Sequence, residues 1–315
     1  MALAAEPAVS NVLPGQCLAS RRRLFQATPG YAMFLIFGVP WALFTLYPLV
    51  KSVILSFQSA TAFGSGGFVG LGNYNELLHD GLWWSAVART LAWASVVVVA
   101  RTLIAVVLAA ALVKCGDGTF TSTARAVLFW PYVLSVSVVT IIWGWLANPQ
   151  FGILTGVVHA LGGPELNWLS SGLAFWLLVL VKVWWWLGFS VLIVHAGMIQ
   201  IPGTQYEAAQ VDGASYWQQF RRITVPFIVP QLEFIVVVGI AQELQVFALP
   251  QILTGGGPGY STYMALQDFY TTAFQDFKLG YASAMALCLT VIAVALALIA
   301  RRVARAANAF EAAAR

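Results

Sequence analysis

The chain has 315 residues, of which 60% are hydrophobic and only 9% are charged, and its formal net charge is +4. A mean hydropathy of +0.81 is more than a soluble core can bury, so the composition excludes a soluble globular protein and indicates a membrane protein. Its cysteines, Cys17, Cys115 and Cys288, are scattered along the chain and support neither a disulfide framework nor a metal site.

Apolar runs long enough to cross a bilayer, which takes about 20 residues of helix, occur along the whole chain. Each run is predicted to be a helix, because lipid cannot satisfy backbone polar groups. In chain order the predicted spans are 31–50, 91–113, 126–147, 173–199, 227–253 and 281–300. The predicted fold is therefore an all-α, polytopic membrane protein with six transmembrane helices.

The predicted division is a tail at 1–30, a transmembrane domain at 31–303 and a second tail at 304–315. An even number of spans puts both tails on one side of the membrane. Most basic residues flank that side: Arg21, Arg22, Arg23, Lys114, Arg125, Arg221, Arg222, Arg301, Arg302, Arg305 and Arg315. Only Lys51, Arg89 and Lys278 lie on the other side. Both termini are therefore predicted to be cytoplasmic, in a plasma membrane.

The loop at 200–226 is polar for so apolar a chain. Thr204 precedes Glu207 by three residues and Ser215 precedes Gln218 by three, which is the spacing of a capping box. The loop is therefore predicted to hold two short helices, separated at Gly213, where glycine can take the left-handed conformation that ends a helix.

Two uses of such a hairpin are open: it could lie on the lipid headgroups, or it could dock on a partner protein. A headgroup-binding face is expected to be rich in Lys and Arg. This loop instead carries Glu207 and Asp212 beside only Arg221 and Arg222. Its composition favours docking on a partner.

The same loop resembles the EAA pattern of permease subunits in ATP-binding-cassette (ABC) importers, in which it forms the coupling helix that docks on a nucleotide-binding subunit. The residues that match or lie within the pattern are Glu207, Ala208, Ala209, Asp212, Gly213, Ile223 and Pro226. Val225 stands where the family usually has leucine. The resemblance implies a coupling role for the matching residues and a type I importer permease fold.

The resemblance also implies partners: a second permease subunit, two ATP-binding subunits that hold ATP and Mg, an extracytoplasmic solute-binding protein, and membrane lipid, with no nucleic acid. The chain contains no G-x-x-x-x-G-K-[ST] phosphate loop. We therefore expect no cofactor and no enzymatic activity in this chain, and nucleotide chemistry in a separate subunit.

Two further stretches, FVGLGNYNELL at 68–78 and LTGGGPGYST at 253–262, resemble carbohydrate permeases of the maltose and glycerol-3-phosphate type. They imply a sugar or sugar-like solute. Where relatives commonly read F-D-x-I-Y, this chain has FALPQ at 247–251, and Pro250 is expected to bend the helix there. The departure leaves the solute open, with a glycerophosphodiester or sugar phosphate as an alternative.

Candidate pathway residues lie in the fourth and fifth spans, because ionisable residues inside a membrane usually face a cavity or a partner. Helical spacing puts four of them on one face of the fourth span: Lys182, Trp185, Trp186 and Phe189. Four more lie near the end of the fifth: Gln242, Glu243, Gln245 and Phe247. Packing between helices is the alternative use, with Glu243 paired with Arg101 or Lys182.

Three classes of function fit a chain of this kind. A secondary transporter or channel acting alone would use intramembrane carboxylates, for which Glu233 and Glu243 are available. A membrane enzyme would gather reactive residues near one membrane face, and none gather in this sequence. The EAA resemblance favours the third class, an importer subunit energised by a separate ATPase.

Overall fold

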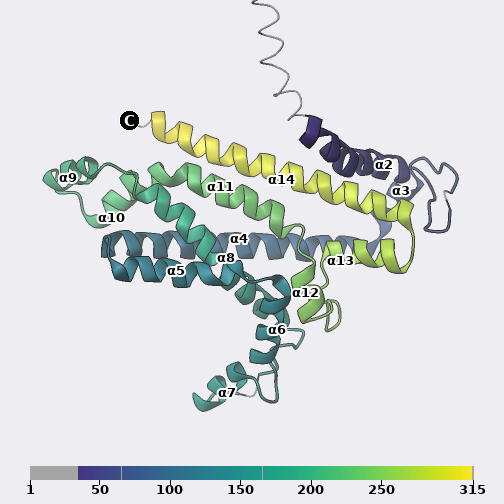
Figure 1. Cartoon of the computed structure of the whole chain (residues 1–315), viewed down its shortest axis with the longest axis horizontal. Helices are drawn as coiled ribbons and strands as arrows, with labels where there is room; N and C mark the ends of the chain where they lie inside the picture. Colours follow the sequence, from purple (N-terminus) through teal and green to yellow (C-terminus); the bar gives the residue numbers. More distant parts are fainter. Residues whose placement is uncertain (1–34, 65, 165, 314–315) are drawn as a thin grey trace, which may run out of the picture. The chain divides into compact units, whose positions relative to one another are not determined.

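The computed structural model describes residues 35–64, 66–164 and 166–313, with side chains described as far as residue 302 (Figure 1). The chain divides into two compact units, Met1–Ile54 and Leu55–Arg315. Regular structure in the described residues is helical, apart from isolated bridges that pair Gln58 with Phe68 and Thr61 with Gly64. The prediction of an all-α fold is confirmed.

The described part of the first unit is a helix. It includes a π-helical turn, η1 (Ala42–Leu46), which continues into α2 (Tyr47–Leu55). The stretch Leu35–Leu55 has 21 residues and is apolar enough to span a membrane. Residues 31–34 of the predicted first span, and the predicted tail at 1–30, lie outside the described residues.

Three spans of the second unit form a packed group: α4 (Gly81–Cys115), α8 (Ala174–Met198) and α11 (Val225–Glu243). Each of these helices packs against the other two, and α14 (Leu279–Ala313) packs against α11. The second span begins at Gly81 instead of residue 91, because Asp80 caps it by accepting hydrogen bonds from the amides of Leu82 and Trp83. The last helix continues past the predicted end of its span at residue 300.

The third span is broken, so the prediction of one helix over 126–147 is wrong. It consists of α5 (Thr119–Val133) and α6 (Val136–Leu146), bent by 100° relative to each other. Leu134 is extended at the break, and Ser135 then caps α6 by accepting a hydrogen bond from the amide of Val138 at 3.4 Å. Helix α5 packs against α8, whereas α6 turns away to pack against α12 (Ala248–Leu253).

The fifth span is also shorter than predicted, because α11 ends at Glu243 and the chain leaves the helix before α12 begins at Ala248. Pro250 is the third residue of α12, where its missing amide has no helical partner to lose. The predicted bend therefore occurs before the proline. The described residues contain five helices able to span a membrane, or six with the broken pair counted as one.

Shorter elements connect the spans. Before α4 lies α3 (Gly72–His79), after α6 lies α7 (Ile153–Ala160), and before α14 lie α13 (Ala265–Tyr270) and the π-helical turn η3 (Thr271–Gln275). The hairpin between α8 and α11 contains α9 (Gly203–Val211), α10 (Tyr216–Gln219) and the π-helical turn η2 (Phe220–Thr224). Figure 1 shows α9 and α10 together beyond the ends of α8 and α11.

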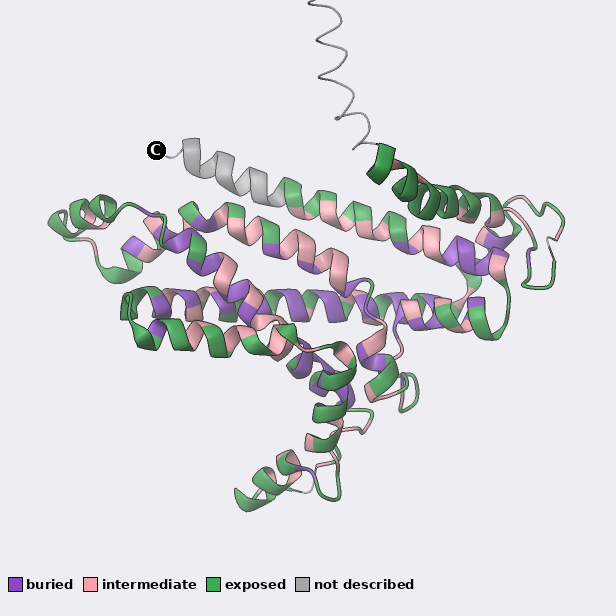
Figure 2. Cartoon of the chain, viewed as in Figure 1, coloured by how far each residue is buried: buried purple, intermediate pink, exposed green. Residues whose placement is uncertain are grey.

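Buried apolar side chains form three clusters in the second unit, and Figure 2 shows most of α8 buried or half-buried. The first cluster lies around Trp93 on α4 and Leu178 on α8, and it includes residues of α6 and α12. The second lies around Val194 on α8 and Ile228 on α11, and the third around Met285 on α14. The three clusters therefore pack α6, α11, α12 and α14 against α4 or α8.

Candidate functional site

The predicted helical hairpin is present. Gly213 separates its two helices with a φ of +73°, the left-handed conformation that glycine adopts without strain. The capping box of the second helix is confirmed: Ser215 Oγ accepts from the amide of Gln218 at 3.4 Å, and Gln218 Oε1 accepts from the amide of Ser215 at 2.7 Å.

The predicted capping box of the first helix is wrong. Helix α9 begins at Gly203 with Pro202 as its cap residue, and it has no side-chain capping hydrogen bond. Because the helix starts one residue before Thr204, that residue already lies inside the first turn. Its hydroxyl is therefore not placed to cap the helix.

The residues matched to the coupling pattern lie mostly on the surface of the hairpin. Glu207, Ala208, Asp212 and Gly213 are exposed, whereas Ala209, Ile223 and Pro226 are half-buried. A cavity of about 380 Å³ opens between the two helices; its lining is Ala209, Asp212, Gly213, Ala214, Gln218, Gln219, Arg222 and Ile223. The hairpin therefore presents a concave surface bordered by the acidic Asp212 and the basic Arg222.

The hairpin is joined to the fifth span without a break. Helix α10 passes through η2 into α11, so that Tyr216–Glu243 is one helical stretch of 28 residues. The hydroxyl groups of Tyr206 on α9 and Thr224 on η2 form a hydrogen bond of 2.8 Å. Both helices of the hairpin are therefore linked to the span, α10 by a continuous helix and α9 by a hydrogen bond.

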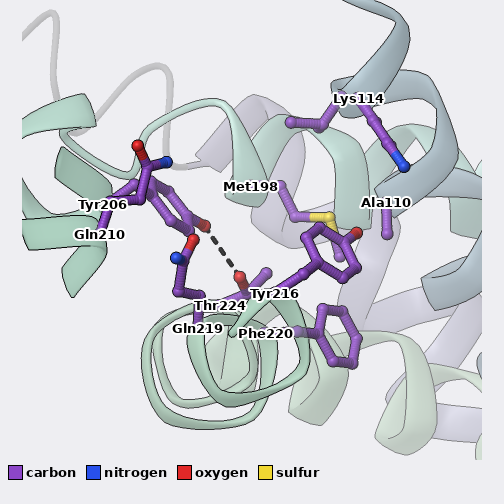
Figure 3. A pocket seen from close by; sticks show the side chains of 10 residues that line it. Ala110, Lys114, Met198, Tyr206, Gln210, Tyr216, Gln219, Phe220 and Thr224 are labelled. Atoms are coloured by element: carbon purple, nitrogen blue, oxygen red, sulfur yellow. Dashed lines mark hydrogen bonds between the residues drawn. The ribbon is translucent and has the colours of Figure 1, made fainter. Parts of the chain in front are cut away.

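A second cavity, which the sequence did not predict, lies where the hairpin meets the ends of α4 and α8 (Figure 3). It measures about 250 Å³ and has a largely apolar lining: Ala110, Val113, Lys114, Met198, Tyr206, Gln210, Tyr216, Gln219, Phe220 and Thr224. Lys114 Nζ lies 5.5 Å from the centre of the Tyr216 ring, within reach of a cation–π contact. Space therefore remains between the hairpin and the membrane helices.

Three charged side chains meet among α4, α8 and α11. Glu243 is fully buried, with Oε1 at 3.6 Å from Arg101 Nη1 and 3.5 Å from Lys182 Nζ. The indole of Trp93 donates a hydrogen bond to Glu243 Oε2 at 3.0 Å. The predicted pairing of Glu243 with Arg101 or Lys182 is confirmed, because Glu243 forms an ion pair with each of them. We call these three residues the charge cluster.

The predicted aromatic face of the fourth span surrounds the charge cluster. Lys182 Nζ lies 5.2 Å from the ring centre of Trp185 and 4.9 Å from that of Trp186. The ring of Tyr132 on α5 makes a T-shaped contact with Trp186, with ring centres 5.0 Å apart, and stacks on Phe189, with ring centres 5.1 Å apart. The four candidates of the fourth span therefore lie together.

The fifth-span candidates are more dispersed. Glu243 belongs to the charge cluster, and its neighbour Gln242 is half-buried. Gln245 is exposed and donates to the carbonyl of Ala241 at 3.1 Å, and the Phe247 ring packs against Tyr270 at 4.9 Å. These last two residues lie beyond the end of α11, which explains their separation from the charge cluster.

Sequence reasoning missed Trp93 and Tyr132 as members of this site. Trp93 lies eight residues before Arg101, a spacing that puts both on one face of α4. That spacing was the available signal for Trp93. Tyr132 had none, because its contact with the fourth span depends on how α5 packs against α8.

The comparisons with known proteins agree with this architecture. Residues 101–309 match the family described as binding-protein-dependent transport system inner membrane component, and the chain belongs to this family. It is 33% identical to the probable ABC transporter permease protein YurN of Bacillus subtilis, over 84% of this chain and 92% of that protein. It is 29% identical to the trehalose/maltose transport system permease protein MalF of Thermococcus litoralis, over 84% of this chain and 90% of MalF.

The fold has also been seen in a solved structure. A chain from the crystal structure of a bacterial ABC transporter involved in the import of the acidic polysaccharide alginate superposes with a TM-score of 0.80, at 21% sequence identity. The alignment covers 91% of this chain and 98% of that one. The chain is thus a multi-pass membrane permease of the ABC importer type, as predicted.

Proposed function

We propose that this permease carries a sugar or sugar-like solute across the plasma membrane, driven by ATP hydrolysis on separate subunits that dock on the hairpin α9–α10. One observation carries the proposal: the hairpin exposes Glu207, Asp212 and Gly213 and is continuous with the fifth span through η2. A rigid helical joint can transmit the movement of a docked ATPase, which a flexible loop would absorb.

The proposed complex contains a second permease subunit, two ATP-binding subunits that hold ATP and Mg, and an extracytoplasmic solute-binding protein. Both termini and the hairpin face the cytoplasm, which is supported by the excess of Lys and Arg on that side. Residues 1–30 and 304–315 are the cytoplasmic tails of a single transmembrane domain. The chain itself holds no cofactor.

The proposed pathway passes the charge cluster and the aromatic face of the fourth span. Tryptophan and phenylalanine rings can stack on the apolar C–H faces of a sugar, and the neighbouring amide and charged groups can bind its hydroxyls. The similarity to a trehalose/maltose permease supports a sugar as the solute.

The coupling role is tested by charge reversal at Glu207 in the complete complex, reconstituted in vesicles. Glu207→Lys should insert normally but lose solute uptake and solute-stimulated ATP hydrolysis. Asp117→Lys is the matched control, because Asp117 is also an exposed carboxylate, in the turn between α4 and α5 and outside the hairpin.

Cysteine crosslinking gives an independent test of the same role. A cysteine placed at Ala208 should crosslink to the nucleotide-binding subunit. Normal uptake by Glu207→Lys, together with no crosslink from position 208, would remove the coupling role.

A further inference from the structure

The charge cluster carries one more positive than negative charge. Arg101 and Lys182 are both buried, and among the described residues Glu243 is the only carboxylate within 4 Å of either cation. Two cations and one carboxylate leave a net charge of +1 inside the transmembrane region. Uncompensated charge at such depth costs several kcal/mol, so it is retained where it faces a functional partner.

The hydrogen-bonding groups of the cluster are incompletely used. Both ion-pair distances, 3.5 and 3.6 Å, exceed the length of a charge-assisted hydrogen bond, which is about 2.8 Å. Arg101 donates only through Nη2, to the carbonyl of Ile235 at 3.4 Å, and its Nε and Nη1 have no hydrogen-bond partner among the described residues. The buried indole nitrogen of Trp186, whose ring lies 5.9 Å from the Arg101 guanidinium carbon, has none either.

Glu243 Oε1, which faces the two cations in the ion pairs, also accepts no hydrogen bond from a described residue, and the other free groups of the cluster are N–H donors. The free Nε and Nη1 of Arg101 carry three N–H bonds and the Trp186 indole carries one, and the ammonium of Lys182, 4.9 Å from the Trp186 ring centre, has three more. Gly239 on α11 leaves the room that the guanidinium occupies, since a Cβ there would overlap Arg101 Nη2. Such a set of donors suits an oxyanion with several acceptor oxygens, such as a carboxylate, phosphate or sulfonate.

The cluster also lies between two helix breaks. Glu243 is the last residue of α11, and the Trp185 indole donates at 3.2 Å to the carbonyl of Leu134, in the break between α5 and α6. Lys182 is the ninth residue of α8, about 12 Å from the start of that helix at 1.5 Å per residue. Non-helical backbone at membrane depth is tolerated only where it is buried in protein or lines a cavity, and in transporters interrupted helices mark the solute site.

The aromatic side chains beside the cluster supply the other half of a site. Trp185 and Trp186 are half-buried, so their rings connect the buried cations with the accessible surface of α8. A sugar ring stacked on an indole would place a charged substituent toward Lys182. A neutral sugar would leave the additional positive charge uncompensated.

We infer that the transported solute is an acidic sugar, whose anionic group binds Arg101, Lys182 and Trp186 while its ring stacks on the aromatic face of the fourth span. This inference rests on the proposed function and specifies its substrate class. The competing interpretation is a purely structural clamp, in which Glu243 joins three helices and the solute never meets the cations.

The test measures binding of labelled sugars to the complete transporter in nanodiscs. The solute-binding protein is left out, so that the measured affinities report the preference of the membrane subunits alone. The probes are labelled D-glucose, D-glucuronate and D-glucose 6-phosphate. They are measured with no nucleotide and again with ATP and vanadate, to sample both access states. One or both acidic probes should bind at least about tenfold more tightly than glucose, the effect of one charge-assisted hydrogen bond.

Three variants distinguish the two interpretations. Lys182→Met should abolish the preference for the acidic probes, and Lys182→Arg should keep it. Glu243→Gln raises the net charge to +2 and should strengthen the preference, whereas loss of a structural clamp would unfold the protein or leave the preference unchanged. If Lys182→Met does not fold, the other two variants decide.

Equal binding of glucose and both acidic probes, or no binding of any probe in either nucleotide state, would overturn the inference. An unchanged preference in folded Lys182→Met would do the same. The proposed function fails by a different result, namely absence of the hairpin crosslink and of solute-stimulated ATP hydrolysis. A transporter that couples normally but prefers glucose would refute the acidic solute alone.

Discussion

Trp185 and Leu134 join the fourth span to the break in the third: the indole Nε1 donates to the Leu134 carbonyl at 3.2 Å. The acceptor belongs to the extended residue between α5 and α6, so it lacks a helical partner of its own. The bond therefore satisfies a backbone group that the bend would otherwise leave unpaired. It also fixes the ring that lies 5.2 Å from Lys182 Nζ.

Trp185→Phe should consequently destabilise the permease by about 1 kcal/mol, the net value of one hydrogen bond. The measurement is unfolding in detergent followed by intrinsic fluorescence. Trp176→Phe is the control, because the Trp176 side chain lies on the same helix and is 57% exposed. Equal effects of the two substitutions would show that the bond to Leu134 contributes nothing.

Tyr206→Phe removes the phenol that bonds to Thr224 and leaves the ring in place. We expect faster hydrogen exchange over α9 and weaker stimulation of ATP hydrolysis by solute, because α9 loses its polar link to η2. Tyr216→Phe serves as the control: that side chain is 60% exposed, and no hydrogen bond to its hydroxyl occurs among the described residues. Unchanged exchange in Tyr206→Phe would show that packing alone holds α9.

At Gly213 the effect of backbone conformation can be tested apart from steric overlap. Its φ is +73°, and an added Cβ would meet no atom within 4 Å. Gly213→Val should therefore cost about 1–2 kcal/mol through left-handed backbone strain, whereas Gly213→Asn should be tolerated. Solute-stimulated ATP hydrolysis and hydrogen exchange of the hairpin provide the readouts. Equal impairment by asparagine and valine would contradict the role of backbone strain.

Gly188 permits close approach of α8 to α5, since a Cβ at that position would overlap the carbonyl of Leu128. Gly188→Ala should force the two helices apart and lower stability by about 1–3 kcal/mol. Gly156→Ala in α7, where an added Cβ meets nothing within 4 Å, should be neutral or slightly stabilising. Detergent unfolding of both variants checks the contrast, and similar stabilities would contradict it.

Asp268 in α13 has its pKa raised to about 6, mainly by burial and next by Asp80, against the opposing effects of Tyr263 and Arg89. Its unfolded value is 3.8, so the folded state binds the proton more tightly. Stability from this residue is therefore greatest below pH 3.8, falls as the pH rises to about 6, and is constant above. Asp268→Asn should remove this slope in unfolding measured from pH 4 to 7, and an unchanged slope would assign it to other carboxylates.

Local sequence patterns predicted the features of this fold that depend on nearby residues. Apolar runs located the membrane helices, and Gly213 and the Ser215–Gln218 pair located the turn and the start of α10. The break at Leu134 was missed because the hydrophobic run continues through it, although Pro131, three residues earlier, was a local signal for a kink or an end of the helix. The early end of α11 at Glu243 was missed for the same reason.

The site divides in the same way. Helical spacing alone grouped Lys182, Trp185 and Trp186, whereas the meeting of Glu243 with Arg101 and Lys182 needs three helices in fixed positions. The free-energy cost of an unpaired charge in a membrane suggested that pairing, but it did not distinguish pairing from contact with solute. Tyr132 could not be found, since its place depends on the packing of α5. The roles of these residues in transport stay predictions.

The π-helical turn η2 gives the link between hairpin and span an additional degree of freedom. Such a turn holds one residue more than an α-helical turn, and each residue of an α-helix advances about 100° around the axis. If η2 tightened to α-helical geometry, α10 would swivel by roughly that angle about the axis of α11. If the hairpin were instead held in place, the same rewinding would turn α11 about its own axis, so η2 could convert a local change of winding into rotation of the span.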